Sequence, residues 1–233
     1  MKNIFLDVFR LFIPRVCPIC GRRLNQAEEL ICSYCMTSLP RAHNFEIPNN
    51  EMEKNLWGKL NVVRAGAWLW YSSHNSAKSL IHNLKYYNDK ASGCIIGRYM
   101  ANEALKVGFF QDIDFIVPVP LHPAKRKKRG YNQSEEIAKG ISQVTGIPVR
   151  TDIILRKENT PTQTKLMQYQ RWDNMCDRFM PGCGAADACG RHILLVDDVF
   201  TTGATTVSAA ESLKNIENTR YSIMAVATSR RNR

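Results

Sequence analysis

The chain has 233 residues, 44% of them hydrophobic, and a formal net charge of +11. This length and apolar content predict a globular protein with one ordinary domain and a small addition, and exclude more than two domains. The positive charge favours polyanionic partners such as nucleic acid or phosphorylated metabolites, although it also serves solubility.

The N-terminal run MKNIFLDVFRLFIPRVC is apolar enough to suggest a signal or a membrane segment. Asp7, Arg10 and Pro14 interrupt it, and its apolar length is far below the roughly 20 residues that a membrane span needs. Its large apolar residues fall on one face at helical spacing: Ile4, Phe5, Val8, Phe9 and Phe12. We therefore expect a docking helix, with a membrane-surface anchor or a signal as alternatives. This interpretation predicts no transmembrane segment and a cytoplasmic protein.

Two C-x-x-C pairs follow, separated by eleven residues: Cys17 with Cys20, and Cys32 with Cys35. Each pair presents two thiolates to one point, and two pairs complete the closed tetrahedron of a structural zinc site. A redox dithiol pair and unligated core cysteines are the alternatives. The remaining cysteines lack this spacing and are expected to behave as small hydrophobic residues: Cys94, Cys176, Cys183 and Cys189.

The rest of the chain alternates predicted strands and helices. Residues 40–60 are polar with two prolines and indicate a linker between an N-terminal module (1–39) and a main domain (61–233). Apolar and alternating runs predict strands at 65–71, 115–119, 148–155, 193–196 and 221–227. Helical patterns occupy 76–87, 91–107, 133–145 and 204–215. This alternation predicts an α/β fold with a mainly parallel sheet flanked by helices on both faces.

The fourth predicted strand is followed by two adjacent acids, Asp197 and Asp198, and then by a turn rich in threonine. Two neighbouring carboxylates disfavour each other's ionisation unless a cation or a hydroxyl-rich ligand shares their charge. Ligands of such folds collect at the carboxyl ends of the strands. Backbone N–H groups of 202–205 and the nearby threonine hydroxyls meet at a predicted helix N-terminus, which suits a phosphate. A sugar phosphate would satisfy both halves.

The run from Ile193 to Thr205 resembles the phosphoribosyl-diphosphate (PRPP) motif of type I phosphoribosyltransferases. The resemblance implies that fold for the main domain. It also implies that Asp197 and Asp198 are catalytic, holding the ribose hydroxyls with Mg²⁺ nearby and stabilising an oxocarbenium-like ribosyl cation. The residues implied to hold the 5′-phosphate are Thr201, Thr202, Gly203, Ala204 and Thr205.

The segment VPVPLHP follows another predicted strand and offers a pyrophosphate loop, with Leu121 and His122 as backbone N–H donors. His122 suits a structural polar role better than that of a general base. A run of five cations comes next and is predicted to be a loop that contacts pyrophosphate or a nucleic-acid backbone, or is merely solvated. Its residues are Lys125, Arg126, Lys127, Lys128 and Arg129, the last also a pyrophosphate candidate.

Several phrases together resemble the ComF family of competence-associated proteins. They are the four-cysteine module with Leu39-Pro40, the segment LIHNLKY (80–86), VPVPLHP with RGYNQ, Gln163-x-x-Leu166, and Arg171-x-x-Asn174. The resemblance covers essentially the whole chain. It implies a zinc ribbon joined to a phosphoribosyltransferase-like domain and a role in handling single-stranded DNA during natural transformation, with competence-machinery proteins as partners.

Three hypotheses follow. The chain is an active phosphoribosyltransferase, a DNA-binding protein that uses PRPP as a ligand, or an adaptor that docks through its ribbon. The second hypothesis adds Lys85, Tyr86 and Tyr131 as nucleic-acid candidates, because aromatic rings beside cations can stack bases. Ordinary packing of the tyrosine at position 86 is an equally good interpretation.

Overall fold

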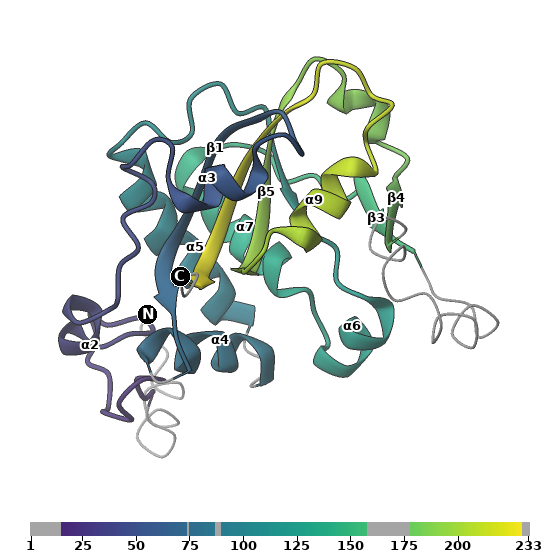
Figure 1. Ribbon diagram of the computed structural model, residues 1–233. Helices are drawn as coiled ribbons and strands as arrows, with labels where there is room; N and C mark the ends of the chain where they lie inside the picture. The colour runs from purple at the N-terminus through teal and green to yellow at the C-terminus, as the bar shows by residue number, and fades with distance from the viewer. Residues whose placement is uncertain (1–14, 74, 87–89, 158–177, 230–233) are drawn as a thin grey trace.

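A four-stranded parallel sheet lies at the centre of the chain (Figure 1). The computed structural model describes residues 15–73, 75–86, 90–157 and 178–229. The strand order is β1-β6-β5-β2, and all three neighbouring pairs are parallel. The strands are β1 (Val62–Tyr71), β2 (Phe115–Pro118), β5 (His192–Phe200) and β6 (Arg220–Ser229).

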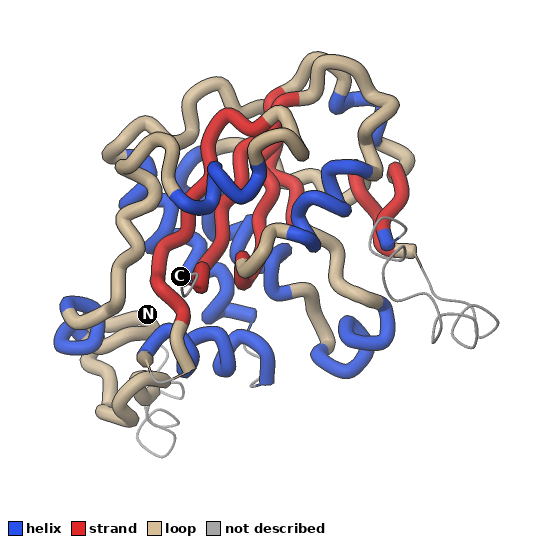
Figure 2. Tube along the Cα trace, in the orientation of Figure 1, coloured by secondary structure: helices blue, strands red, loops and turns tan. Residues whose placement is uncertain are grey.

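Helices cover both faces of this sheet (Figure 2). Because side chains alternate along a strand, Leu194 and Val196 of β5 pack with one layer while Ile193 and Leu195 pack with the other. The first layer contains α4 (Ser76–Tyr86), α5 (Lys90–Leu105) and α7 (Gln133–Thr145). The second contains α3 (Glu51–Leu56) and α9 (Ala204–Glu211). The predicted parallel α/β architecture is confirmed, and the helices expected at 76–87, 91–107 and 133–145 are present with ends within two residues.

Glycines set the distance between α5 and α7. A Cβ atom at Gly97 would overlap the carbonyl oxygen of Ile137, and one at Gly140 would overlap that of Cys94. Only hydrogen at these positions lets the two backbones approach so closely. This contact holds α7 against the first layer and so fixes where its N-terminus meets the sheet.

The predicted strand at 148–155 is wrong. The chain touches the sheet edge through one parallel bridge, Val149 with Ile116, and then bends away. It next forms β3 (Ile154–Arg156), which pairs antiparallel with β4 (Phe179–Pro181) in a separate hairpin. Different parts of this apolar run therefore pair with two different sheets. Strand periodicity alone cannot show which sheet a segment joins.

The segment 40–60, expected to be a linker, is packed into the main core. Asn50 caps α3 by accepting hydrogen bonds from two first-turn N–H groups, and its side chain also donates to the carbonyl of Ala65 in β1. Met52 and Leu56 are buried against the sheet. The polar residues of this segment form a helix cap and an exposed surface, so its polar composition does not indicate a linker.

The N-terminal module contains α2 (Ser33–Thr37) and lies beside α4, on the side of the molecule away from the β3–β4 hairpin (Figure 1). Its Ile31 and Leu39 belong to the same buried cluster as Leu80 of α4. A guanidinium–carboxylate contact between Arg98 of α5 and Glu29 adds to this packing. The module is thus attached by apolar and ionic contacts. The remaining elements are α6 (Pro123–Arg129) and the short η2 (Ala185–Ala188).

Several predicted features lie outside the described residues. They are the N-terminal helix at 4–12 and the motif residues Gln163, Leu166, Arg171 and Asn174. Within the described ranges, every helix is too short or too polar to cross a membrane.

Candidate functional site

The two acids lie near the carboxyl end of β5, inside the strand rather than after it. The strand runs four residues further than predicted and ends at Phe200. Val119 donates its backbone N–H to Val196 at 2.9 Å, which brings the segment after β2 alongside the acids. Asp197 accepts the backbone N–H of Asp198 on its Oδ1 at 2.8 Å, so the pair is held in one orientation.

Two distant segments converge on this pair. The Lys85 ammonium at the end of α4 lies 2.9 Å from Oδ2 of Asp198, and the two side chains are only 24% and 18% exposed. From the start of α7, the Ser134 hydroxyl donates to Oδ1 of Asp197 at 3.4 Å. Ser134 was not among the predicted site residues, and its only sequence signal is that it directly follows RGYNQ. Lys85, a predicted nucleic-acid contact, forms an ion pair with an acid in this structure.

The electrostatics of the pair favour a bound cation. Burial, together with the neighbouring charge of Asp198, raises the pKa of Asp197 to about 7, although Lys85 opposes this shift. At neutral pH a proton therefore competes for this carboxyl. A divalent cation or vicinal hydroxyl groups supply the same compensation without protonation, so the pair suits a ligand that carries them.

The turn between β5 and α9 presents donors next to the acids. The side chains of Thr201, Thr202 and Thr205 are exposed, while Gly203 is buried. Thr202 Oγ1 accepts from the backbone N–H of Ala204 at 3.4 Å. The first-turn N–H groups of α9 have no acceptors within the helix, so this end attracts an anion. All five predicted phosphate-binding residues thus lie on one turn.

Gly203 makes this turn sterically feasible. Its φ is +77°, a left-handed conformation that other residues adopt only at a cost. A Cβ there would lie 2.7 Å from Cζ of Phe200 and 3.2 Å from Cδ2 of Leu56. The core beneath the turn therefore has no room for a side chain.

The pyrophosphate candidates occupy the segment after β2. His122 caps α6, its Nδ1 accepting the backbone N–H of Ala124 at 3.2 Å. This hydrogen bond fits the structural role expected of His122. Arg129 donates from Nη1 to Oε1 of Gln133 at 3.0 Å, and Leu121 is partly buried. The three residues are near one another in sequence. The hydrogen bonds of His122 and Arg129 described here stabilise the chain itself.

The five cations form a helix, not the predicted loop. His122 caps α6, Pro123 occupies its first turn, and Gly130 ends it with φ of +77°. These are ordinary helix start and stop signals, and lysine and arginine are good helix formers. The cations at 125–128 are exposed, whereas Arg129 is only partly so.

Tyr131 does not fit the proposed base-stacking role. It is 3% exposed, and its hydroxyl donates to the carbonyl of Leu84 at 2.5 Å. This bond joins the RGYNQ phrase to the end of α4, immediately before Lys85. The side chain of Tyr86 lies outside the described residues.

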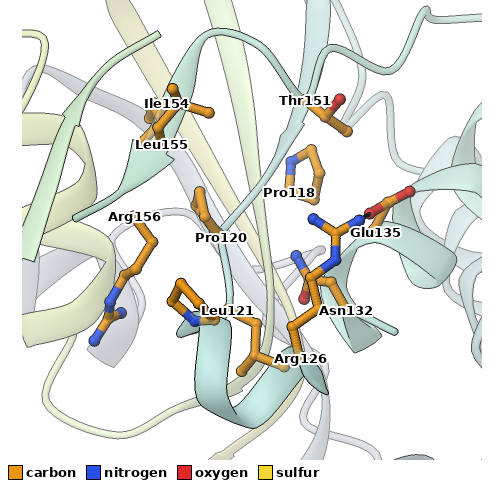
Figure 3. Close-up of a pocket in the computed structure, with 11 residues that line it drawn as sticks. Pro118, Pro120, Leu121, Arg126, Asn132, Glu135, Thr151, Ile154, Leu155 and Arg156 are labelled. Atoms are coloured by element: carbon orange, nitrogen blue, oxygen red, sulfur yellow. Dashed lines mark ion pairs between the residues drawn. The ribbon is translucent and has the colours of Figure 1, made fainter. Parts of the chain in front are cut away.

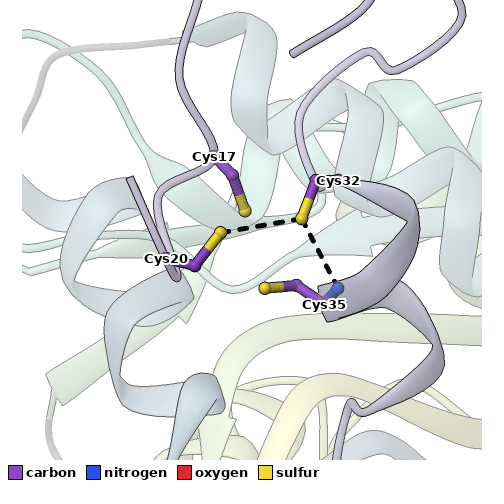
Figure 4. A group of neighbouring side chains, drawn as sticks. All are labelled: Cys17, Cys20, Cys32 and Cys35. Carbon is purple, nitrogen blue, oxygen red and sulfur yellow. Dashed lines mark hydrogen bonds between the residues drawn. The ribbon is translucent and has the colours of Figure 1, made fainter. Parts of the chain in front are cut away.

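The four cysteines of the N-terminal module converge (Figure 4). Their Sγ atoms all lie within 4.8 Å of one another, and Cys20 and Cys32 are 3.6 Å apart. Tetrahedral zinc with Zn–S bonds of about 2.3 Å requires sulfur separations of roughly 3.8 Å. The donor set and its spacing therefore fit a structural zinc site.

Neighbouring groups support these thiolates. The backbone N–H of Cys35 lowers the pKa of Cys32 to about 7, and it donates to that sulfur at 3.5 Å. Glu28 links the two cysteine pairs, accepting from Arg22 at 3.0 Å and from the backbone and hydroxyl of Ser33, both at 2.7 Å. These bonds fix the loop between the pairs in position.

The fold and these two sites define a parallel α/β protein with an acid pair beside a donor-rich turn and a four-cysteine module whose geometry fits a metal ion. No protein-family profile matches the chain. It is 27% identical over 202 residues to the DNA utilization protein YhgH of Escherichia coli K12, covering 85% of this chain and 83% of that protein. It is 33% identical over 101 residues to Competence protein F of Haemophilus influenzae, covering 43% and 44%. Competence protein ComFC of Bacillus subtilis is 25% identical over 200 residues, covering 85% and 71%.

These similarities to DNA utilization and competence proteins support the resemblance to the ComF family. Among solved structures the chain is similar to a glutamine PRPP amidotransferase from B. subtilis, with a TM-score of 0.41 and 16% identity. That similarity covers 63% of this chain but only 30% of the amidotransferase chain. A likeness this distant adds nothing to what the strand order and the two sites already define.

Proposed function

We propose that this protein binds PRPP with Mg²⁺ at the end of β5 and acts in natural transformation or DNA uptake by binding single-stranded DNA. The observation that carries the first part is the acid pair beside the donor-rich turn at the start of α9. Relatives named as DNA utilization and competence proteins support the second part.

In this proposal three segments each bind a different part of PRPP. Asp197 and Asp198 accept hydrogen bonds from the ribose 2′ and 3′ hydroxyls, and the 201–205 turn holds the 5′-phosphate. The pyrophosphate lies toward Leu121 and His122, whose segment borders the acids. Mg²⁺, when bound with PRPP, would neutralise the charge of the pyrophosphate and of the acids.

The DNA contact is proposed for α6. Four successive exposed cations on a short helix make a dense positive surface, and single-strand affinity from such contacts weakens with salt. Zinc held by the four cysteines is proposed to stabilise the N-terminal module, which leaves its outer face for competence-machinery partners. A cytoplasmic location is part of this proposal, because a reducing compartment keeps cysteine thiols available to bind zinc.

An alternative is an active phosphoribosyltransferase that transfers ribose phosphate to a small acceptor in nucleotide metabolism. The observation in its favour is that both carboxylates are present and oriented, since a pure binding module has less need of two. Incubation with isotopically labelled PRPP and a panel of nucleobases separates the two functions. A labelled nucleotide product supports the enzyme, and intact PRPP supports the binding protein.

The PRPP site is tested with the double variant Asp197→Asn/Asp198→Asn. Loss of charge-assisted hydrogen bonds should weaken Mg²⁺-dependent PRPP binding about tenfold or more in calorimetry. The control is Asp187→Asn, an exposed carboxylate in η2 near the opposite end of β5. Unchanged PRPP affinity in a folded double variant would refute the site.

The DNA contact is tested by replacing the four exposed α6 cations with glutamine, which preserves helix propensity. Affinity for a short single strand should fall, and its dependence on salt should become shallower by about 0.7 per lost phosphate contact. Arg129 stays unchanged because it holds Gln133. A variant with the parent's affinity and salt slope would place the DNA contacts elsewhere.

A further inference from the structure

A cavity lies at the end of β2, between the segment that follows β2 and the strand β3 (Figure 3). Its volume is about 320 Å³, which is at the small end of the roughly 300–1,000 Å³ typical of small-molecule sites. The end of β2 and its following segment form one wall, and β3 forms the other. Neither the acids nor the phosphate turn lines it, but it shares Leu121 with the proposed pyrophosphate segment, so it adjoins the proposed PRPP site.

The walls suit a flat, apolar body. Pro120 and Leu121 line one side, and Ile154 and Leu155 line the other. Leu155 is 40% exposed although it faces this cavity. Rigid prolyl and leucyl surfaces can sandwich a nucleobase and remove its two faces from water.

The cavity also carries positive charge. Arg156 stacks over the ring of Phe179 at 4.5 Å, and the charge of Asp197 acts on its guanidinium. Arg126 lies across the pocket in Figure 3, paired with Glu135 at 3.6 Å but still 63% exposed. Glu135 is balanced further by Lys139 at 3.1 Å. The net field at the rim therefore favours an anion.

We propose that this cavity binds one nucleotide unit, with its base between Pro120–Leu121 and Ile154–Leu155 and its phosphate on Arg156. Arg126 belongs to both this cavity and α6, so a strand following the α6 cations leads directly into the pocket. The nucleotide is either a unit of a single strand or a free nucleoside monophosphate. The strand source rests on the DNA role proposed above.

The experiment compares Arg156→Gln with the parent, using a fluorescent deoxythymidine decamer and free deoxythymidine monophosphate as probes. Loss of a charge-assisted contact to phosphate should weaken binding about tenfold. The matched control is Arg191→Gln, which removes one positive charge at the amino end of β5, where Arg191 pairs with Asp114. Leu155→Glu is the second variant, since an exposed residue tolerates change and the new carboxylate repels phosphate.

Weakening of the decamer alone assigns the pocket to a strand, and weakening of the monophosphate assigns it to a free nucleotide. Folded Arg156→Gln and Leu155→Glu proteins that bind both probes like the parent would overturn the pocket while leaving the DNA role intact. A parent that binds neither probe would overturn the pocket and the DNA role together. Unchanged Mg²⁺-dependent PRPP binding in the same samples would show that the variants leave the acid pair intact.

Discussion

Lys85 Nζ lies 2.9 Å from Oδ2 of Asp198, so a cation at the end of α4 rests on an acid at the end of β5. The lysine also lowers the pKa of the adjacent Asp197. In the absence of ligand it therefore supplies part of the positive charge that the acid pair requires.

Replacing Lys85 with methionine should raise the pKa of Asp197 above its value of about 7, because a stabilising positive charge is lost. Carboxyl carbon chemical shifts followed through a pH titration measure this directly. Lys139→Met is the control, because Lys139 pairs with Glu135 and Glu136 instead. Identical titration of Asp197 in both variants would show that the ion pair does not persist in solution.

Asp197→Asn should stabilise the protein at pH 8 and have little effect near pH 4. The folded-state pKa of about 7 exceeds the ordinary value of 3.8, so the carboxyl contributes stability below pH 4 that is lost as pH rises through 7. Each pKa unit corresponds to about 1.4 kcal/mol, and partial exposure of this residue reduces the total to on the order of 2 kcal/mol. Urea unfolding at the two pH values measures the difference. A gain that is larger at pH 4 would contradict the shift.

Cys32→Ser should abolish stable metal binding by the N-terminal module. Loss of a direct ligand is expected to cost more than the roughly 10–100-fold in affinity that removing a supporting partner costs. Elemental analysis should find one zinc per parent chain, and thermal unfolding of the variant should begin at lower temperature. Cys183→Ser, an exposed thiol outside the cluster, should behave like the parent. Parent protein that has never met a chelator and still lacks zinc would count against the site.

Gly203→Ala should destabilise the protein more than Gly146→Ala. The two glycines have nearly the same φ, +77° and +74°, so both substitutions incur the left-handed penalty of about 1–2 kcal/mol. Only at Gly203 would the new Cβ also meet Phe200, at 2.7 Å, whereas Gly146 has open space within 4 Å. The difference between their unfolding free energies isolates the steric part. Equal losses would mean that Phe200 moves aside freely.

Features formed by residues that are close together in the sequence could be predicted from it. The acids and their glycine turn lie on one strand–turn–helix segment, and the two C-x-x-C pairs do meet within 4.8 Å. The helices of the first layer also follow their patterns closely. Helix α6 also has local signals, since a capping residue, Pro123 and Gly130 frame it, but a run of charges is equally typical of a solvated loop.

Tertiary packing decided what no local pattern contains. Lys85 and Ser134 reach the acids from other helices, across a separation of 63 residues in the case of Ser134. The burial of Tyr131 against α4 and the pairing of the 154–156 strand with β4 likewise depend on partners distant in the chain. Periodicity and motif spacing report a residue's chemistry and its local conformation. Its neighbours depend on how helices and sheet pack, and that is settled by long-range contacts such as the close approach of α5 and α7 at Gly97.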